Sequence, residues 1–187
     1  MIAANVAQLL RDPVGSTRSY ALDEHEPVLA EELGLISPIV GTLKLTRTNH
    51  GILADVRYRV DIEQECGRCL ESAFAVIESD VSEEYLPSLN IVTGQPVVIE
   101  ADPDEPRVTQ NHEVDVTDLV RQDIVIQQPL QPLCQPDCPG LCQQCGAVLQ
   151  HGDCGCVDEP VDAEVPVSAN NQLSRLGELL KAQLPPG

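Results

Sequence analysis

The sequence predicts an α+β fold, with an antiparallel β-meander or barrel-like domain, a few helices and an appended four-cysteine module. Two observations carry this prediction. From residue 39 onward apolar residues alternate with polar ones, which is the period of a strand with one buried and one wet face. Six of the eight cysteines fall between residues 134 and 156, at the short spacings of a metal-binding knuckle.

The alternation predicts the strands in order. Residues 39–46 and 52–62 form a predicted hairpin around the turn Thr48-Asn49-His50-Gly51, and a third strand is expected at 73–84. A shorter strand is expected at 17–22. Because the chain has one Phe, three Tyr and no Trp, its core must be built from Val, Leu, Ile and Ala.

Helices are expected at 4–11, 116–127 and 171–183, where apolar residues recur at helical spacing. Asp115 can cap the second of them. The acidic stretch 24–32 contains Pro27 and is interpreted as loop, and the Pro-, Asn- and Asp-rich stretch 86–112 as loop with at most one edge strand. We therefore expect a β-rich domain at 1–130, a cysteine-rich zinc module at 131–157, and an acidic linker with a C-terminal helix at 158–187.

The net charge of −19 predicts a chain that repels nucleic acid on average and attracts basic partners. Residues 42–69 are the exception, since this stretch contains five basic and four acidic residues. Lys44, Arg57 and Arg59 fall on the same polar face of the predicted hairpin, so they are the candidate nucleic-acid contacts. An ordinary solvated surface is the alternative interpretation.

The cysteines predict one or two structural zinc ions, because four thiolates complete the closed shell of such a site. The first candidate set is Cys142, Cys145, Cys154 and Cys156, in which Gly146 gives the turn its backbone freedom. The second candidate set is Cys66, Cys69, Cys134 and Cys138, for which free thiols or another ligand set remain open. His151, between Cys145 and Cys154, is interpreted as a surface residue, and a role as a substitute ligand is the alternative.

Disulfides and redox-active thiols are the alternatives to metal. The N-terminus has no basic region before its apolar residues, so it does not predict a signal peptide. A chain of 187 residues can also be stabilised by its hydrophobic core and does not need disulfide bonds. A redox CxxC is typical of a βαβ context, which the pattern lacks. No Ser/His/Asp set, phosphate loop or paired-carboxylate motif stands out, so we expect no catalytic residue and no small-molecule substrate. No apolar run is long enough to span a membrane.

The order of motifs resembles the YceD family, the large ribosomal RNA subunit accumulation proteins. The resemblance rests on Glu65-Cys66-Gly67-Arg68-Cys69-Leu70-Glu71, Val114-Asp115-Val116-Thr117-Asp118-Leu119-Val120-Arg121, Pro129-Leu130-Gln131-Pro132-Leu133-Cys134, Gly140-Leu141-Cys142, Cys145-Gly146 and Cys154-Gly155-Cys156. It implies a bacterial, cytoplasmic protein that supports accumulation or processing of large-subunit rRNA, with no known enzymatic step.

The resemblance and the charge together predict two classes of partner, large-subunit rRNA and basic ribosomal proteins. The protein could bind either class or both. A metal-dependent nuclease or hydrolase acting on rRNA is the alternative function. It would need an open coordination position, which a shell of four thiolates does not leave.

Overall fold

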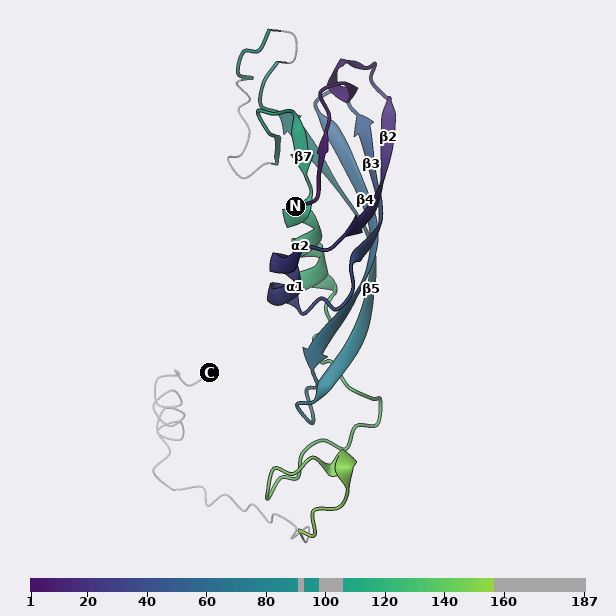
Figure 1. The fold of residues 1–187 in the computed structure, drawn as a ribbon, viewed down its shortest axis with the longest axis vertical. Helices are drawn as coiled ribbons and strands as arrows, with labels where there is room; N and C mark the ends of the chain where they lie inside the picture. The colour runs from purple at the N-terminus through teal and green to yellow at the C-terminus, as the bar shows by residue number, and fades with distance from the viewer. Residues whose placement is uncertain (91–92, 98–105, 157–187) are drawn as a thin grey trace, which may run out of the picture.

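The computed structural model describes residues 1–90, 93–97 and 106–156. Its centre is a five-stranded sheet in the order β2-β3-β4-β5-β6 (Figure 1). The strands are β2 (Thr17–Glu24), β3 (Ile39–Arg47), β4 (Ile52–Glu65), β5 (Ser72–Pro87) and β6 (Arg107–Val108). The first four pair antiparallel with their neighbours along the chain, and β6 joins β5 in parallel. The predicted meander is confirmed.

The N-terminus is a strand, so the helix expected at 4–11 is wrong. β1 (Ala3–Asn5) pairs antiparallel with β7 (Glu113–Asp115), and only Leu9–Arg11 forms a single turn of 3-10 helix. Ile2, Ala4 and Val6 are all buried, and this spacing of two is that of a strand. Pairing with a distant strand decides the conformation here, over a helical pattern too short to be stable alone.

The stretch 24–32 contains a helix, α1 (Pro27–Leu33), so its interpretation as loop is also wrong. Pro27 is the first helical residue, where its fixed φ favours a helix and its missing N–H is not needed. Leu29 and Leu33 are buried one turn apart, and Gly34 ends the helix at a φ of 68°. The proline therefore starts the helix.

The second helix, α2 (Thr117–Gln127), confirms the helix expected at 116–127. The N-cap residue is Val116, so the assignment of Asp115 as the cap is wrong, but the Asp115 carboxylate still accepts a hydrogen bond of 2.9 Å from the Thr117 N–H at the start of the helix. Val116, Val120 and Ile124 are buried on its inner face. The helix expected at 171–183 and the linker before it lie outside the described residues.

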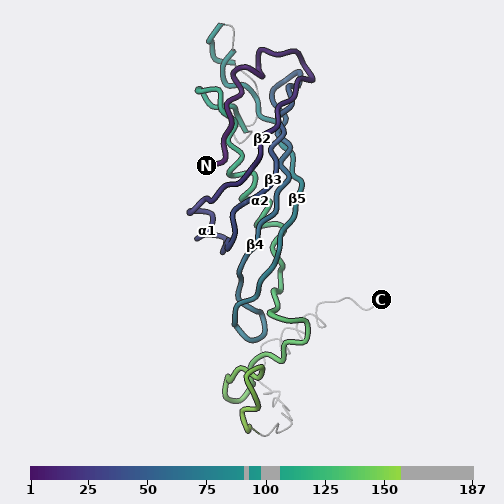
Figure 2. The backbone as a smooth tube through the Cα atoms, turned by 45° about the vertical axis from the view of Figure 1, so that its right-hand side comes forward, coloured from purple at the N-terminus to yellow at the C-terminus, as the bar shows by residue number. Residues whose placement is uncertain are grey.

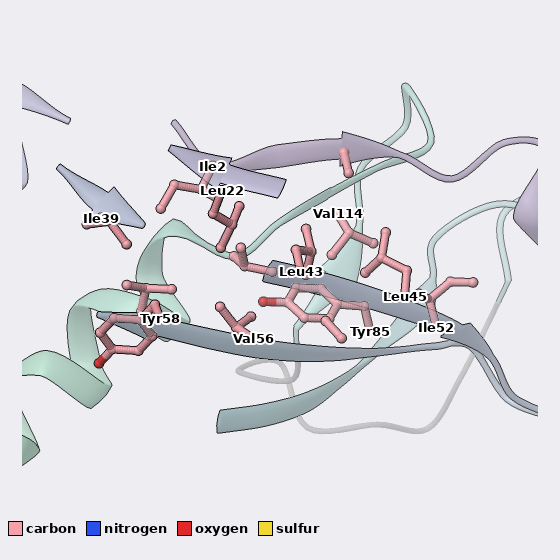
Figure 3. Close-up of a cluster of buried hydrophobic side chains, with 14 of the residues drawn as sticks. Ile2, Leu22, Ile39, Leu43, Leu45, Ile52, Val56, Tyr58, Tyr85 and Val114 are labelled. Atoms are coloured by element: carbon pink, nitrogen blue, oxygen red, sulfur yellow. The ribbon is translucent and has the colours of Figure 1, made fainter. Parts of the chain in front are cut away.

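One face of the sheet forms the core, and α1, α2 and the β1–β7 pair lie against it (Figures 1 and 2). The buried side chains of β4 recur at every second residue: Ile52, Ala54, Val56, Tyr58, Val60 and Ile62. Figure 3 shows Tyr58 and Tyr85 among aliphatic side chains from several strands. The two tyrosines supply the bulk that this chain, poor in aromatic residues, otherwise lacks.

A hydrogen bond connects the core face with α2. The Tyr58 hydroxyl on β4 donates to the Asp123 carboxylate at 2.6 Å. Burial, the hydrogen bond to Asp123 and the charge of Asp123 raise the pKa of Tyr58 above its ordinary value. The phenol therefore stays protonated and keeps donating well above neutral pH.

We expect Tyr58→Phe to lower the free energy of unfolding by about 1 to 2 kcal/mol at pH 7, because Asp123 loses its donor. Because the folded-state pKa is raised, this contribution is fully present below about pH 10, the ordinary pKa of tyrosine, and is lost progressively as the pH rises from there through the folded-state pKa. Urea unfolding at pH 7 and pH 11 measures both effects. Tyr20→Phe is the control, since its hydroxyl has no hydrogen bond among the described residues. Equal unfolding midpoints for both variants at pH 7 would contradict the assignment.

Candidate functional site

The first cysteine group lies at the tip of the β4–β5 hairpin, and we call it the hairpin cysteine group (Cys66, Cys69, Cys134 and Cys138). Cys66 and Cys69 belong to the turn between the two strands, and the other two follow α2. The Cys66 and Cys138 sulfurs lie 3.8 Å apart, and those of Cys69 and Cys134 lie 3.6 Å apart. Three of the four side chains are buried. The structure thus brings together two pairs that the sequence separates widely.

The second group lies further along the chain, at the end of the molecule that Figure 1 draws in light green. We call it the distal cysteine group (Cys142, Cys145, Cys154 and Cys156). Its side chains are less buried, and Cys145 is exposed. His151 is not among its ligand atoms. Its imidazole Nε2 lies 2.9 Å from the Glu71 carboxylate, so it faces the hairpin tip.

The two CxxC turns have the same backbone structure. In the first, the Cys66 N–H donates to Glu71 and the Leu70 N–H donates back to Cys66. In the second, the Cys142 N–H donates to Ala147 and the Gly146 N–H donates back to Cys142. The fifth residue of each turn is left-handed, with a φ of 64° at Leu70 and 74° at Gly146. Two segments far apart in sequence thus form one knuckle geometry.

Backbone N–H groups converge on the first sulfur of each knuckle. Hydrogen bonds from the N–H groups of Cys134, Arg68 and Cys69 lower the pKa of Cys66 to about 6. The same effect, from Cys145 and Gln144, lowers the pKa of Cys142 to about 6. One thiolate in each group therefore forms readily at neutral pH, and a thiolate is the form of cysteine that binds metals.

Other thiols in the groups resist ionisation without a cation. Burial, followed by hydrogen bonds with neighbouring thiols, raises the pKa of Cys134 to about 12. Hydrogen bonds with Cys145 and Cys154, followed by burial, raise the pKa of Cys156 to about 12. Several sulfurs crowded together cannot all carry negative charge unless a positive ion offsets their repulsion.

The donor atoms fit a tetrahedral metal ion. Within each group the four sulfurs lie within 4.8 Å of one another. Bonds of about 2.3 Å in a tetrahedron place sulfurs about 3.8 Å apart, close to the two distances of the hairpin cysteine group. Those distances exceed a disulfide bond of about 2.05 Å, and all eight cysteines are free. Both groups could hold a metal ion.

The loop between Cys145 and Cys154 in the distal cysteine group packs against the hairpin cysteine group. Val148 packs on the cluster around the hairpin cysteine group, and Gln150 accepts a hydrogen bond from the Cys134 sulfur. The Leu149 N–H donates to Gly140, and Arg68 donates to the Cys138 carbonyl at 2.9 Å. The hairpin tip therefore carries the whole described cysteine-rich segment.

The candidate nucleic-acid contacts share one surface. We call it the outer face, meaning the outward side chains of β2, β3, β4 and β5. Register places Thr42 opposite Arg57 and Val40 opposite Arg59, so Lys44, Arg57 and Arg59 are neighbours there, as the alternation predicts. Sequence reasoning missed their carboxylate partners. Asp80 lies 2.7 Å from the Arg57 Nε, and Glu78 lies 2.6 Å from an Arg59 terminal nitrogen.

These carboxylates change the electrostatics of the outer face. Asp55 lies opposite Lys44 in the register, and Asp61 lies 3.9 Å from Arg59. Each basic side chain thus has an acidic neighbour, and acidic side chains outnumber basic ones on the outer face. The signal that could have found Glu78 and Asp80 is the pairing of β5 with β4, which puts them directly opposite the two arginines.

A sequence model of the family described as "Large ribosomal RNA subunit accumulation protein YceD" matches residues 54–180, well over half of the chain. The chain belongs to the YceD family. The match includes all eight cysteines, Arg57 and Arg59, and it begins after Lys44. The family description names accumulation of large-subunit rRNA and no reaction.

Curated relatives come from mycobacteria. An uncharacterized protein of Mycobacterium tuberculosis is 27% identical over 109 residues, which are 57% of this chain and 49% of the relative. An uncharacterized protein of Mycobacterium leprae is 28% identical over 141 residues, or 69% of this chain and 60% of the relative. The YceD chain spans about half to three fifths of the length of these relatives. No solved structure matches it. None of the helices in the described ranges is both long and apolar enough to cross a bilayer.

Proposed function

We propose that this YceD chain is a non-enzymatic bacterial ribosome-biogenesis factor that acts in the cytoplasm as an adaptor during accumulation of large-subunit rRNA. Membership of the YceD family is the observation that carries the proposal. The chain would work in three parts, a β-rich domain at 1–130, a cysteine-rich module at 131–157 and an acidic C-terminal stretch at 158–187. Each cysteine group would hold one structural zinc ion.

Zinc is the metal that suits these ligands. Four thiolates in a tetrahedron are a common shell of structural zinc, and such a shell leaves no position for water or substrate. The ion would fix the orientation of the cysteine-rich segment on the hairpin tip, and the ligand residues would contribute no proton transfer. This arrangement supports an adaptor over a metal-dependent nuclease, which needs an open coordination position.

The charge distribution favours a basic protein partner over naked RNA. The net charge is −19, and the arginines of the outer face already pair with Asp80 and Glu78. Phosphate contacts through Lys44, Arg57 and Arg59 would have to compete with these carboxylates. A basic ribosomal protein would instead be attracted by the acidic surface, and the complex could then approach rRNA.

The function is tested by removing the gene from its bacterium and measuring the ratio of large-subunit to small-subunit rRNA. We expect the ratio to fall, and the wild-type chain to restore it. An unchanged ratio in the deletion strain would contradict the proposal. Purified protein incubated with rRNA should leave it intact. Cleavage that disappears on mutating a single carboxylate would instead support the nuclease.

Removing the two carboxylates opposite the arginines is expected to strengthen RNA binding. In the double variant Glu78→Gln/Asp80→Asn, Arg57 loses its acidic partner, and Arg59 keeps only Asp61 at 3.9 Å. Two more phosphates can then be neutralised, so the slope of log affinity against log salt should steepen by about 1 to 2. Filter binding to large-subunit rRNA at several salt concentrations measures it.

The matched control is Asp23→Asn/Glu24→Gln. It removes the same charge from exposed positions of β2 that pair with no arginine in the described ranges. Equal slopes for the two double variants would show that only net charge matters. A wild-type chain that binds naked rRNA tightly at physiological salt would contradict the adaptor mechanism.

A further inference from the structure

β5 is paired on one side only along most of its length. It pairs with β4 from Ser72 to Tyr85, whereas β6 joins its other side only at Leu86 and Pro87. Among the described residues no strand or isolated bridge meets that other side between Ser72 and Tyr85. We call this side the free edge of β5. Proteins rarely leave so long an edge without covering it or giving it a partner.

The backbone groups that point to the free edge can be assigned. The Leu86 N–H donates to the Pro106 carbonyl at 3.1 Å, away from β4. Backbone direction alternates along a strand, and the β4–β5 register is unbroken. The N–H and C=O groups of every second residue therefore face the free edge, namely Phe74, Val76, Glu78, Asp80, Ser82 and Glu84. None of these backbone groups has a hydrogen bond from another described segment on that side.

The side chains of the same residues form a pattern on the outer face. Phe74 and Val76 are 66% and 53% exposed, which is high for a Phe and a Val. Glu78 and Asp80 follow, also well exposed. Each of these carboxylates binds an arginine through one oxygen, so its other oxygen can bind a second cationic side chain. The free edge thus offers two apolar residues followed by acidic ones.

This pattern argues against a second copy of the chain as occupant. An antiparallel pair centred on Ser79 would place Glu78 opposite Asp80 of the other copy, and like charges opposite each other destabilise a sheet. Two chains of net charge −19 also repel each other. The charge instead complements a strand with apolar residues opposite Phe74 and Val76 and with Lys or Arg opposite Glu78 and Asp80.

We propose that the free edge of β5 binds an extended basic segment of a partner protein, which adds a strand to the sheet. The choice of a basic protein as the partner rests on the proposed function. The geometry of the free edge does not depend on that function. Main-chain hydrogen bonds would supply affinity and the alternating side chains specificity, as in other strand-addition complexes.

The test uses the full chain and the nine-residue peptide Thr-Lys-Thr-Lys-Thr-Val-Thr-Val-Thr, which can pair antiparallel with β5 so that its Lys residues lie opposite Asp80 and Glu78 and its Val residues opposite Val76 and Phe74. Hydrogen exchange followed by NMR should show slower exchange of the Val76, Glu78 and Asp80 amides when the peptide binds. The amides of Ile77 and Ser79 already face β4 and should change little. The same peptide with Glu in place of both Lys residues should not bind. Protection of neither set, or of both sets equally, would overturn the proposal.

Val76→Pro is the variant that isolates the backbone. Its N–H faces the free edge, so proline removes a docking hydrogen bond and no bond to β4. We expect peptide affinity to fall about tenfold, the upper effect of one backbone hydrogen bond. Val76→Thr keeps the N–H and should bind like wild type. Should Val76→Pro fail to fold, the same peptide N-methylated at alternate residues gives the answer with the wild-type chain.

Two further outcomes would also overturn the proposal. Peptide binding that survives both Val76→Pro and N-methylation would be purely electrostatic. A concentration-dependent dimer in sedimentation would show that a second copy of the chain occupies the free edge. The strand-addition proposal and the proposed function can fail separately. If a Val76→Pro chain fully restores the rRNA ratio in the deletion strain, strand addition at the free edge is rejected and the proposed function stands.

Discussion

Cys142→Ser is expected to reduce the metal content from two ions per chain to one and to unfold the distal cysteine group. Structural zinc contributes about 10 to 16 kcal/mol to the folding of small zinc peptides, so the segment around Cys145 should not stay folded after losing a ligand. The sheet should survive, because its core contains none of these residues. Metal analysis of protein purified without added zinc, with hydrogen exchange of residues 141–151, measures both effects.

Cys138→Ser is the matched variant in the hairpin cysteine group. It should also remove one ion, and in addition it should release the cysteine-rich segment from the hairpin tip, so that the Gly67 N–H loses its bond to the Pro132 carbonyl. Both losses should grow as the pH falls, because thiols with a raised pKa must give up protons when the metal binds. A purified wild-type chain that contains no metal, with its eight cysteines oxidised to disulfides, would contradict both predictions.

Leu43→Ala is expected to lower the free energy of unfolding by about 2 to 5 kcal/mol, because the side chain is fully enclosed and its removal leaves a cavity. Leu43 lies on the core side of β3 and is labelled in Figure 3. Thr42→Ala, its outward neighbour, should change stability by less than about 0.5 kcal/mol. Urea unfolding followed by circular dichroism measures the difference.

Metal content separates this prediction from the previous one. Leu43→Ala should keep both ions below its unfolding transition, since the cysteine groups lie at the far end of the hairpin (Figure 1). Equal unfolding midpoints for Leu43→Ala and Thr42→Ala would show that the β3 side chain does not support the core.

The strands that face both core and solvent could be predicted from the sequence. Alternation along β4 identifies its buried residues, because a period of two leaves only one arrangement with the apolar side inside. The N-terminal strand and α1 could not be predicted in this way. Ala3–Asn5 is a strand because Glu113–Asp115 lies beside it, and no local pattern reports a partner more than a hundred residues away.

The candidate site shows the same division. CxxC spacing identifies the knuckles because the turn that aims two sulfurs at one point is local. The acidic partners of Arg57 and Arg59 come from another strand, and only the β4–β5 register places them there. The sequence-based count of charges over residues 42–69 therefore found a near-neutral stretch but not its ion pairs.

The ligands of the two cysteine groups differ in their separation along the sequence, and this difference affects the order in which the groups can form. The distal group uses ligands from one short segment, whereas Cys66 and Cys138 are 72 residues apart and Cys69 and Cys134 are 65 apart. A short loop closes faster and with less entropy loss than a long one. At about 5 to 20 residues per second, ribosomes would make the second half of the hairpin group roughly 3 to 13 s after the first. During that interval the nascent hairpin holds an open pair of thiols, and α2 must be synthesised before the pair can be completed.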